Sequence, residues 1–206
     1  MLAKTALTTL VALLPLSTAV AQTLPGPTFS DPTRIDNPYA PVEPDTIKVY
    51  AGRDEGDVTL TVEKHLGETR TFDYGGLEVE ARIIEERSYV DGRLAEVSFH
   101  YLAQDDRGNV AYFGEVSWEY DDGEDATPEE DSWLVGGATQ ATDPPEAFNA
   151  GEPTIYMVAD PQVGDTFQQQ MFPNSDETLT VVAVGDVVRT PAGTFQTAVR
   201  IKETSN

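Results

Sequence analysis

The sequence predicts an all-β fold: a single antiparallel meander that forms a curved sheet or an incompletely closed barrel, with one long acidic loop. Apolar residues alternate with polar ones over most of the chain, as they do in half-buried strands. Turn sequences rich in Gly, Asp and Pro separate these runs. No stretch sustains the period of about 3.6 residues that an amphipathic helix needs, and no fixed-period repeat is present.

Residues 1–21 have the layout of a cleavable signal peptide. Lys4 is the only charge in this segment, an apolar run from 6 to 16 follows, and Ala19-Val20-Ala21 supplies small residues before a cleavage site. The apolar run is shorter than the ~20 residues of a membrane-spanning helix. We therefore expect a soluble mature chain that starts at Gln22, has no membrane anchor, and is secreted or periplasmic.

The charge balance excludes several partners. The chain has 13 basic and 36 acidic side chains, a net charge of -23, and loss of Lys4 with the signal gives 12 - 36 = -24. Such a surface repels phosphate backbones and anionic lipids, so we expect no nucleic acid partner. With Cys 0, the chain has no disulfide, thiolate nucleophile or cysteine-based metal site. The 39% hydrophobic content is enough for a folded core.

Two segments follow the signal: a leader at 22–45 and a single β-domain at 46–206. The leader is expected to lie extended along the domain because it is rich in proline. Its prolines are Pro25, Pro27, Pro32, Pro38, Pro41 and Pro44.

The first half of the domain predicts successive hairpins. Runs at 47–51 and 58–62 flank the turn Asp54-Glu55-Gly56-Asp57. The adjacent Ile83-Ile84 breaks the alternation of the run that starts at Leu77, which suggests a bulge or a strand that changes sheets. Asp91-Gly92 is the strongest hairpin signal, because a two-residue turn of this type needs positive φ.

After this turn, Ala95, Val97, Phe99 and Tyr101 share one strand face, and Glu96, Ser98 and His100 share the other. The turn at 105–109 leads to strands within 110–120, and residues 121–150 form the long acidic loop. Strands resume at 155–158, 166–172, 179–184, 187–188 and 195–201, with a turn at Pro191-Ala192-Gly193 before the last of them.

Four motifs resemble an uncharacterised family of secreted bacterial all-β proteins. They are Asp36-Asn37-Pro38-Tyr39, the segment 101–115 (YLAQDDRGNVAYFGE), the segment 159–167 (ADPQVGDTF) and the segment 191–195 (PAGTF). The resemblance implies a β-meander and no particular activity, since these are turn and packing residues. Relatives continue past Asn206 with another hairpin, so the resemblance implies that the sequence is either a fragment or has lost its closing strands. If these strands are absent, the last strand of 46–206 is an exposed edge.

No catalytic or cofactor-binding residue is predicted, and no cofactor is expected. His65, placed at the end of a strand, and His100, on a polar strand face, are interpreted as ordinary structural histidines. No Gly-x-Ser-x-Gly or Ser-x-x-Lys motif surrounds any serine of the mature chain, which disfavours a serine hydrolase. These serines are Ser30, Ser88, Ser98, Ser117, Ser132, Ser175 and Ser205.

The acidic runs 121–125 and 129–131 predict a solvated loop, and a calcium site is the alternative. They do not match an EF-hand, because Ala126 stands where that motif has glycine. The identity of any metal site therefore stays open at this point.

The aromatic residues of the central region are interpreted as core. The sharper interpretation is a ligand groove that the segment 121–150 covers. The residues are Tyr112, Phe113, Trp118, Tyr120 and Trp133.

These observations predict an exported, non-enzymatic acidic β-domain that binds a small apolar ligand or a protein in the concavity of its sheet. One alternative is a calcium-binding exoprotein. A second alternative is a hydrolase that uses a pair of carboxylates.

Overall fold

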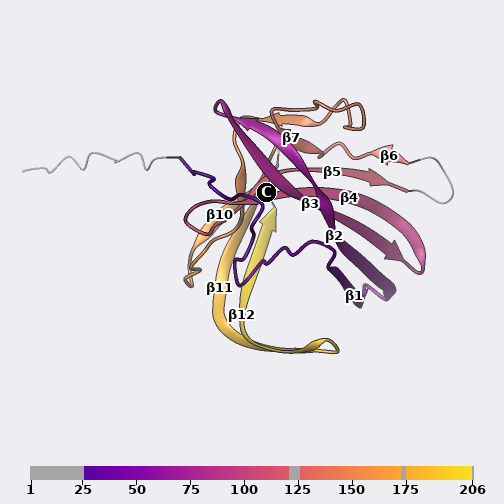
Figure 1. Cartoon of the computed structure of the whole chain (residues 1–206). Coiled ribbons are helices and arrows are strands. Elements are labelled where there is room, and N and C mark those ends of the chain that lie inside the picture. The colour runs from indigo at the N-terminus through magenta and orange to yellow at the C-terminus, as the bar shows by residue number, and fades with distance from the viewer. Residues whose placement is uncertain (1–25, 121–125, 173–174, 206) are drawn as a thin grey trace, which may run out of the picture.

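The computed structural model describes residues 26–120, 126–172 and 175–205, with backbone alone at 170–172, 175–177 and 205. The described residues form an all-β fold with a nine-stranded sheet and a three-stranded sheet (Figure 1). This confirms the predicted curved, mostly antiparallel meander without a closed barrel. No described residue belongs to a helix that could cross a membrane.

The large sheet is built from hairpins in chain order, and β5 is its branch point. Different parts of the outer edge of β5 pair with β6, β7 and β9, and β8 pairs in parallel with β7. The strands are β1 (Ile47–Asp54), β2 (Asp57–Tyr74), β3 (Leu77–Val90), β4 (Arg93–Gln104), β5 (Val110–Glu119), β6 (Thr127–Pro128), β7 (Trp133–Val135), β8 (Phe148–Ala150) and β9 (Thr154–Met157).

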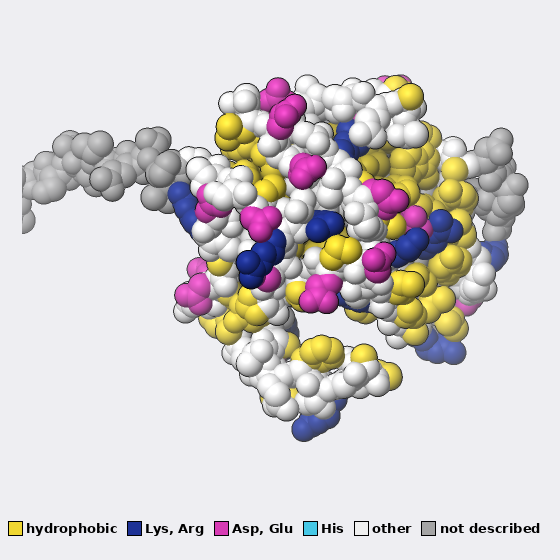
Figure 2. Space-filling view, viewed as in Figure 1, with side chains coloured by type: hydrophobic (Ala, Val, Ile, Leu, Met, Phe, Trp, Pro, Cys, Tyr) yellow, Lys and Arg dark blue, Asp and Glu magenta, His cyan; other side chains and the backbone are white. Residues whose placement is uncertain are grey.

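The small sheet is a meander whose last two strands form a long arm. It consists of β10 (Thr166–Phe172), β11 (Ser175–Thr190) and β12 (Gly193–Ser205), in that order, with β12 at the edge. The β11–β12 hairpin extends away from the body and curves below β1 (Figure 1). Figure 2 shows hydrophobic side chains on the side of this arm that faces the body. The exposed apolar residues of the arm include Val184, Val187 and Phe195.

Local turn chemistry sets the hairpins as predicted. Asp91 and Gly92 have φ of 49° and 79°, so this two-residue turn matches the twist of β3 and β4. The predicted first hairpin is β1–β2. The predicted bulge at Ile83-Ile84 is wrong: β3 is regular there, and the extra residues lie on β2 between His65 and Thr69. Ile83 and Ile84 are both apolar because the sheet is covered on both faces at this point.

The two faces of the large sheet have different partners. We call the face of Phe72 and Tyr101 the tyrosine face, and the face of Glu63, His100 and Leu102 the histidine face. Tyr101 and His100 are consecutive in β4, so their side chains point to opposite sides. On the tyrosine face, the rings of Phe72 and Tyr101 pack edge to face with centroids 5.4 Å apart.

A buried ion pair attaches the segment after β7 to the tyrosine face. The Arg70 guanidinium donates to both carboxylate oxygens of Asp143, at 2.7 and 2.9 Å, and it lies over the rings of Phe72 and Tyr101. The Arg70 and Asp143 side chains are 3% and 2% exposed. Asp143 also accepts the backbone N–H of Thr139 at 2.8 Å. The segment is thereby held against the sheet rather than lying in solvent.

The predicted long acidic loop at 121–150 is largely ordered structure. Its run 121–125 lies outside the described residues, but the remainder contains β6, β7 and β8. Trp133 is fully buried and packs edge to face on Tyr112, with ring centroids 5.1 Å apart. A Cβ at Gly114 would lie 2.5 Å from the Trp133 carbonyl oxygen, so glycine permits β7 to approach β5 this closely.

The described part of the leader lies along the domain, as predicted. Asn37 is buried and donates from its side chain to the Gly108 carbonyl at 2.9 Å, while its backbone N–H donates to Gln104 Oε1 at 2.9 Å. The Ala159 N–H donates to Asn109 Oδ1 at 2.9 Å. Residues of three sequence motifs, at 36–39, 101–115 and 159–167, therefore meet in one structural junction.

Replacement of Asp143 by Ala is expected to lower the free energy of unfolding by about 3–5 kcal/mol, because it leaves the Arg70 charge buried without a partner. Urea unfolding followed by fluorescence measures this change. Glu146→Ala is the matched control, since Glu146 is an exposed acid of the same segment and its loss should change stability by less than about 0.5 kcal/mol. Equal effects of the two substitutions would contradict the anchoring role of the ion pair.

Candidate functional site

A cavity of about 370 Å³ lies between the two sheets. Its floor is the histidine face of the large sheet, and Leu179, Ile201 and Glu203 of the small sheet line it from the other side. Residues 39–42 of the leader and β9 complete its wall. The position is set by tertiary structure, since four segments far apart in the sequence contribute to it.

The lining combines an apolar part with three tyrosine rings. Leu102 is fully buried and Ile84 is 5% exposed, so this part of the wall is held in place by core packing. The other apolar lining residues include Met157, Leu179 and Ile201, and the tyrosines are Tyr39, Tyr50 and Tyr156. Such a lining suits the apolar body of a small ligand.

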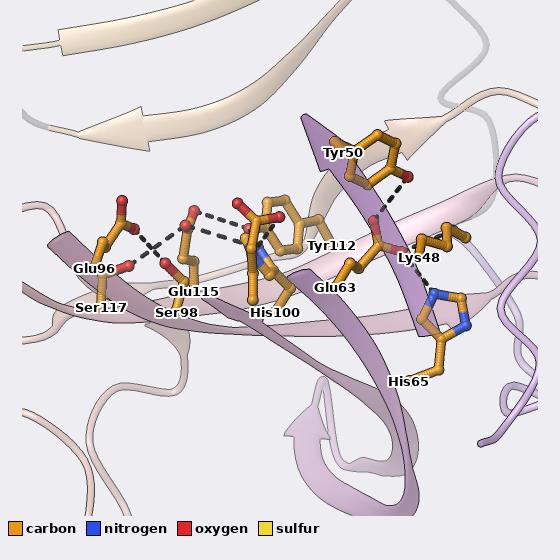
Figure 3. A network of polar contacts seen from close by, with 11 residues as sticks. Lys48, Tyr50, Glu63, His65, Glu96, Ser98, His100, Tyr112, Glu115 and Ser117 are labelled. Atoms are coloured by element: carbon orange, nitrogen blue, oxygen red, sulfur yellow. Dashed lines mark hydrogen bonds and ion pairs between the residues drawn. The ribbon is translucent and has the colours of Figure 1, made fainter. Parts of the chain in front are cut away.

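A hydrogen-bonded group around Glu63 forms the polar part of the lining. Lys48 and Glu63 are directly paired across β1 and β2. Lys48 Nζ lies 2.7 Å and His65 Nε2 lies 2.6 Å from Glu63 Oε1, and the Tyr50 hydroxyl donates to Glu63 Oε2 at 3.2 Å (Figure 3). His65 Nδ1 lies 3.1 Å from the Glu43 carbonyl oxygen. Every member of the group is therefore positioned by a neighbour.

These contacts hold Glu63 in its ionised form. Burial by itself would raise the pKa of Glu63, but hydrogen bonds from His65 and Lys48 and their charges outweigh it and lower the pKa to about 2. Burial, together with the Glu63 charge, raises the pKa of Tyr50 to about 12. Near neutral pH the site thus presents a carboxylate and neutral phenol hydroxyls.

A second polar group lies on the same face, on β4 and β5 (Figure 3). The Tyr112 hydroxyl donates to Glu115 Oε2 at 2.9 Å, and His100 Nδ1 lies 2.6 Å from the same hydroxyl. The hydroxyl has one hydrogen, so His100 Nδ1 is the donor in its contact with Tyr112. His100 Nε2 is buried without a hydrogen-bond partner among the described residues, and Glu86 Oε2 lies 4.0 Å from it.

The carboxylates near His100 are crowded. Burial raises the pKa of Glu86, the His100 charge opposes this shift, and the charges of Glu63, Glu96 and Glu115 add to it. Burial also raises the pKa of Tyr112 well above its usual value, with Glu115 as the second cause. The histidine face therefore has a negative potential that extends from β2 to β5.

Both histidines lie on this face. The expectation that His100 lies on a polar strand face agrees with the structure, but the expectation that His65 lies at a strand end does not. His65 was placed at a strand end, but it is in the middle of β2 and 1% exposed, because the strand continues through a bulge instead of turning. Ser98 follows the predicted face but bonds Glu96, not His100. In the described structure neither imidazole hydrogen-bonds to a serine, so the two histidines do not form a serine nucleophile pair.

The predicted ligand groove beneath Trp133 is wrong. Tyr112 and Trp133 fill the interior there and are at most 1% exposed, whereas the equally buried Phe113 packs against Phe72 on the tyrosine face. Trp118 packs edge to face on Phe99, with ring centroids 5.9 Å apart. Trp133 is therefore a core residue and does not cover a groove. The cavity lies elsewhere on the histidine face, against the small sheet.

The acidic run at 129–131 places carboxylates close together. Burial, a hydrogen bond with Asp131 and the charges of Glu96, Asp131 and Glu119 raise the pKa of Glu129 to about 8. Within the described ranges, no group of three or more His, Asp or Glu side chains is placed to hold a metal ion. The run 121–125 lies outside the described residues.

Comparison of the chain with known protein families, curated proteins and solved structures found no match. Inferences about function therefore depend on the geometry of the chain itself.

Replacement of Glu63 by Gln tests the polar group of the cavity. The low pKa of Glu63 means that the folded state gains stability above the ordinary pKa of 4.5 and loses it as the pH falls toward about 2. We expect Glu63→Gln to lower the free energy of unfolding by about 1–3 kcal/mol near neutral pH, because donors lose a charged acceptor. The difference from wild type should shrink in thermal melts toward pH 2, and a difference independent of pH would contradict the assignment.

Glu129 should give the opposite pH dependence. Its pKa of about 8 lies above the ordinary 4.5, so ionisation destabilises the folded state progressively as the pH rises through this window. Glu129→Gln is expected to melt at a higher temperature than wild type at about pH 9 and at the same temperature at about pH 4. Glu130→Gln, at an exposed neighbour, is the control and should show no such crossover.

Proposed function

We propose that this chain is an exported, non-enzymatic β-domain that binds a small ligand in the cavity between its two sheets. The cavity carries the proposal: about 370 Å³ is within the ~300–1,000 Å³ of small-molecule sites, and its lining joins apolar side chains with a few polar groups. The predicted signal peptide supports export, and the net charge of -23 argues against nucleic acid as the ligand.

A hydrolase with a carboxylate pair is the second candidate, and one observation favours it. Glu63 and Glu86 are directly paired on β2 and β3, and their pKa values are shifted in opposite directions. However, both oxygens of Glu63 already accept hydrogen bonds from Lys48, His65 or Tyr50. A carboxylate engaged in this way is positioned to bind and orient rather than to attack, so we prefer the binding function.

The binding proposal is tested with the neutral fluorescent probe N-phenyl-1-naphthylamine. Wild-type protein should bind it saturably with one site per chain, and Ile201→Trp should weaken binding at least about tenfold by filling the cavity. Val187→Trp is the matched control: it makes the same kind of change on the same hairpin, at a side chain that is 49% exposed and outside the cavity lining.

Thermal melting establishes that both tryptophan variants are folded. Binding that is equally strong in Ile201→Trp and wild type would place the probe elsewhere and overturn the proposed site. Absence of saturable binding to wild type would overturn the proposal itself.

A further inference from the structure

The geometry points to an organic cation as the ligand: an ammonium group attached to an apolar body, with the ammonium near Tyr50, Tyr156 and Glu203. This inference rests on the proposed binding function and specifies the chemical class of its ligand. It follows from the charge, aromatic rings and apolar wall that converge on the cavity between the sheets.

The first argument is the balance of charge in the lining. Lys48 is the basic residue among the described lining residues, whereas Glu63 and Glu203 are acidic. The Lys48 ammonium is 2.7 Å from Glu63 Oε1, so its charge is directed at that carboxylate. The Glu203 carboxylate is thereby left as the uncompensated charge of the lining, and it is exposed on the small sheet.

The second argument is the potential on the histidine face. Glu86 and Glu115 lie on this face beyond the cavity, on either side of His100, with oxygens 4.0 and 3.7 Å from its ring nitrogens. The pKa of Tyr156 is raised by burial and then by the charges of Glu63, Glu86 and Glu115. These carboxylates therefore act on Tyr156, a residue that lines the cavity, and their negative potential disfavours an anionic ligand there and favours a cationic one.

The third argument is the aromatic lining. Tyr39, Tyr50 and Tyr156 all line the cavity. Tyrosine ring faces attract ammonium groups, most strongly where water is partly excluded. Tyr50 and Tyr156 are neutral phenols near pH 7, since their pKa values are raised above the ordinary 10, and their oxygens can accept hydrogen bonds from an ammonium.

The fourth argument is the apolar part of the lining, which comes from both sheets. Leu102, Leu179 and Met157 are at most 8% exposed, so they provide a dry surface for the apolar part of the ligand. A small ion without an apolar body would leave these side chains in contact with water. The combination thus selects an amphipathic amine over an inorganic cation.

A series of three probes with the same chain tests the ligand class: octylammonium, octanol and octanoate, each measured by displacement of N-phenyl-1-naphthylamine at pH 7. We expect octylammonium to compete at least about tenfold better than octanol, and octanoate at least about tenfold worse. The preference for octylammonium should decrease as salt rises from about 0.05 to 0.5 M, because exposed Glu203 is screened.

Two glutamine variants locate the preference. Glu203→Gln removes the charge at the edge of the cavity and should reduce the octylammonium preference at least about threefold, with octanol unchanged. Glu80→Gln removes an exposed acid of β3 outside the cavity lining and should leave all three probes unchanged. Glu63 is unsuitable for this test because its hydrogen bonds also stabilise the fold.

The outcomes separate the ligand class from the binding function. If octanol binds as well as octylammonium, or octanoate binds best, the cationic ligand class is overturned while the binding site stands. If Glu80→Gln reduces the preference as much as Glu203→Gln, the preference comes from net charge and the assignment to the cavity is overturned. If no probe displaces the dye and the dye itself does not bind, the binding function fails together with the inference.

Discussion

The buried pair of Arg70 and Asp143 is the interaction on which the arrangement of the two faces depends. A guanidinium that is 3% exposed is tolerated only with a partner, and Asp143 supplies both carboxylate oxygens. Since Asp143 also binds the backbone of Thr139 and Gln140, the segment after β7 is fixed on the tyrosine face. The histidine face is then left for the small sheet, and the cavity forms where the two sheets do not fill the space between them.

Two other partly buried acids, Glu63 and Glu129, have pKa values that are shifted in opposite directions by their neighbours. Glu63 is surrounded by Lys48, His65 and Tyr50, and its pKa falls to about 2. Glu129 has acids as neighbours, and its pKa rises to about 8. In a chain of net charge -23, donors are too few to satisfy every carboxylate. Lys48, His65 and Tyr50 all donate to Glu63 at the cavity, which is consistent with a site that keeps a defined charge near neutral pH.

Local features of the fold were predictable because their causes are local. The Asp91-Gly92 turn needs only two positive φ values, and alternation in β4 places the consecutive residues His100 and Tyr101 on opposite faces. The site was less predictable. The sequence predicts a strand end at His65 because the residues after it no longer alternate between apolar and polar. The pairing of β2 with β3 shows instead that the strand continues through a bulge. The Glu63–Lys48 contact follows from the β1–β2 register, which the turn sequence could have indicated.

The sequence by itself determined the strand-rich fold, the hairpin turns, the acidity and the absence of cysteine chemistry, because these follow from residue type and spacing along the chain. Tertiary structure alone decided that Arg70 meets Asp143, that Trp133 is core rather than lid, and that Ile201 faces Leu102 across a cavity. Such contacts join segments separated by tens of residues. Their existence depends on which face of the sheet each segment covers, and no local periodicity encodes that choice.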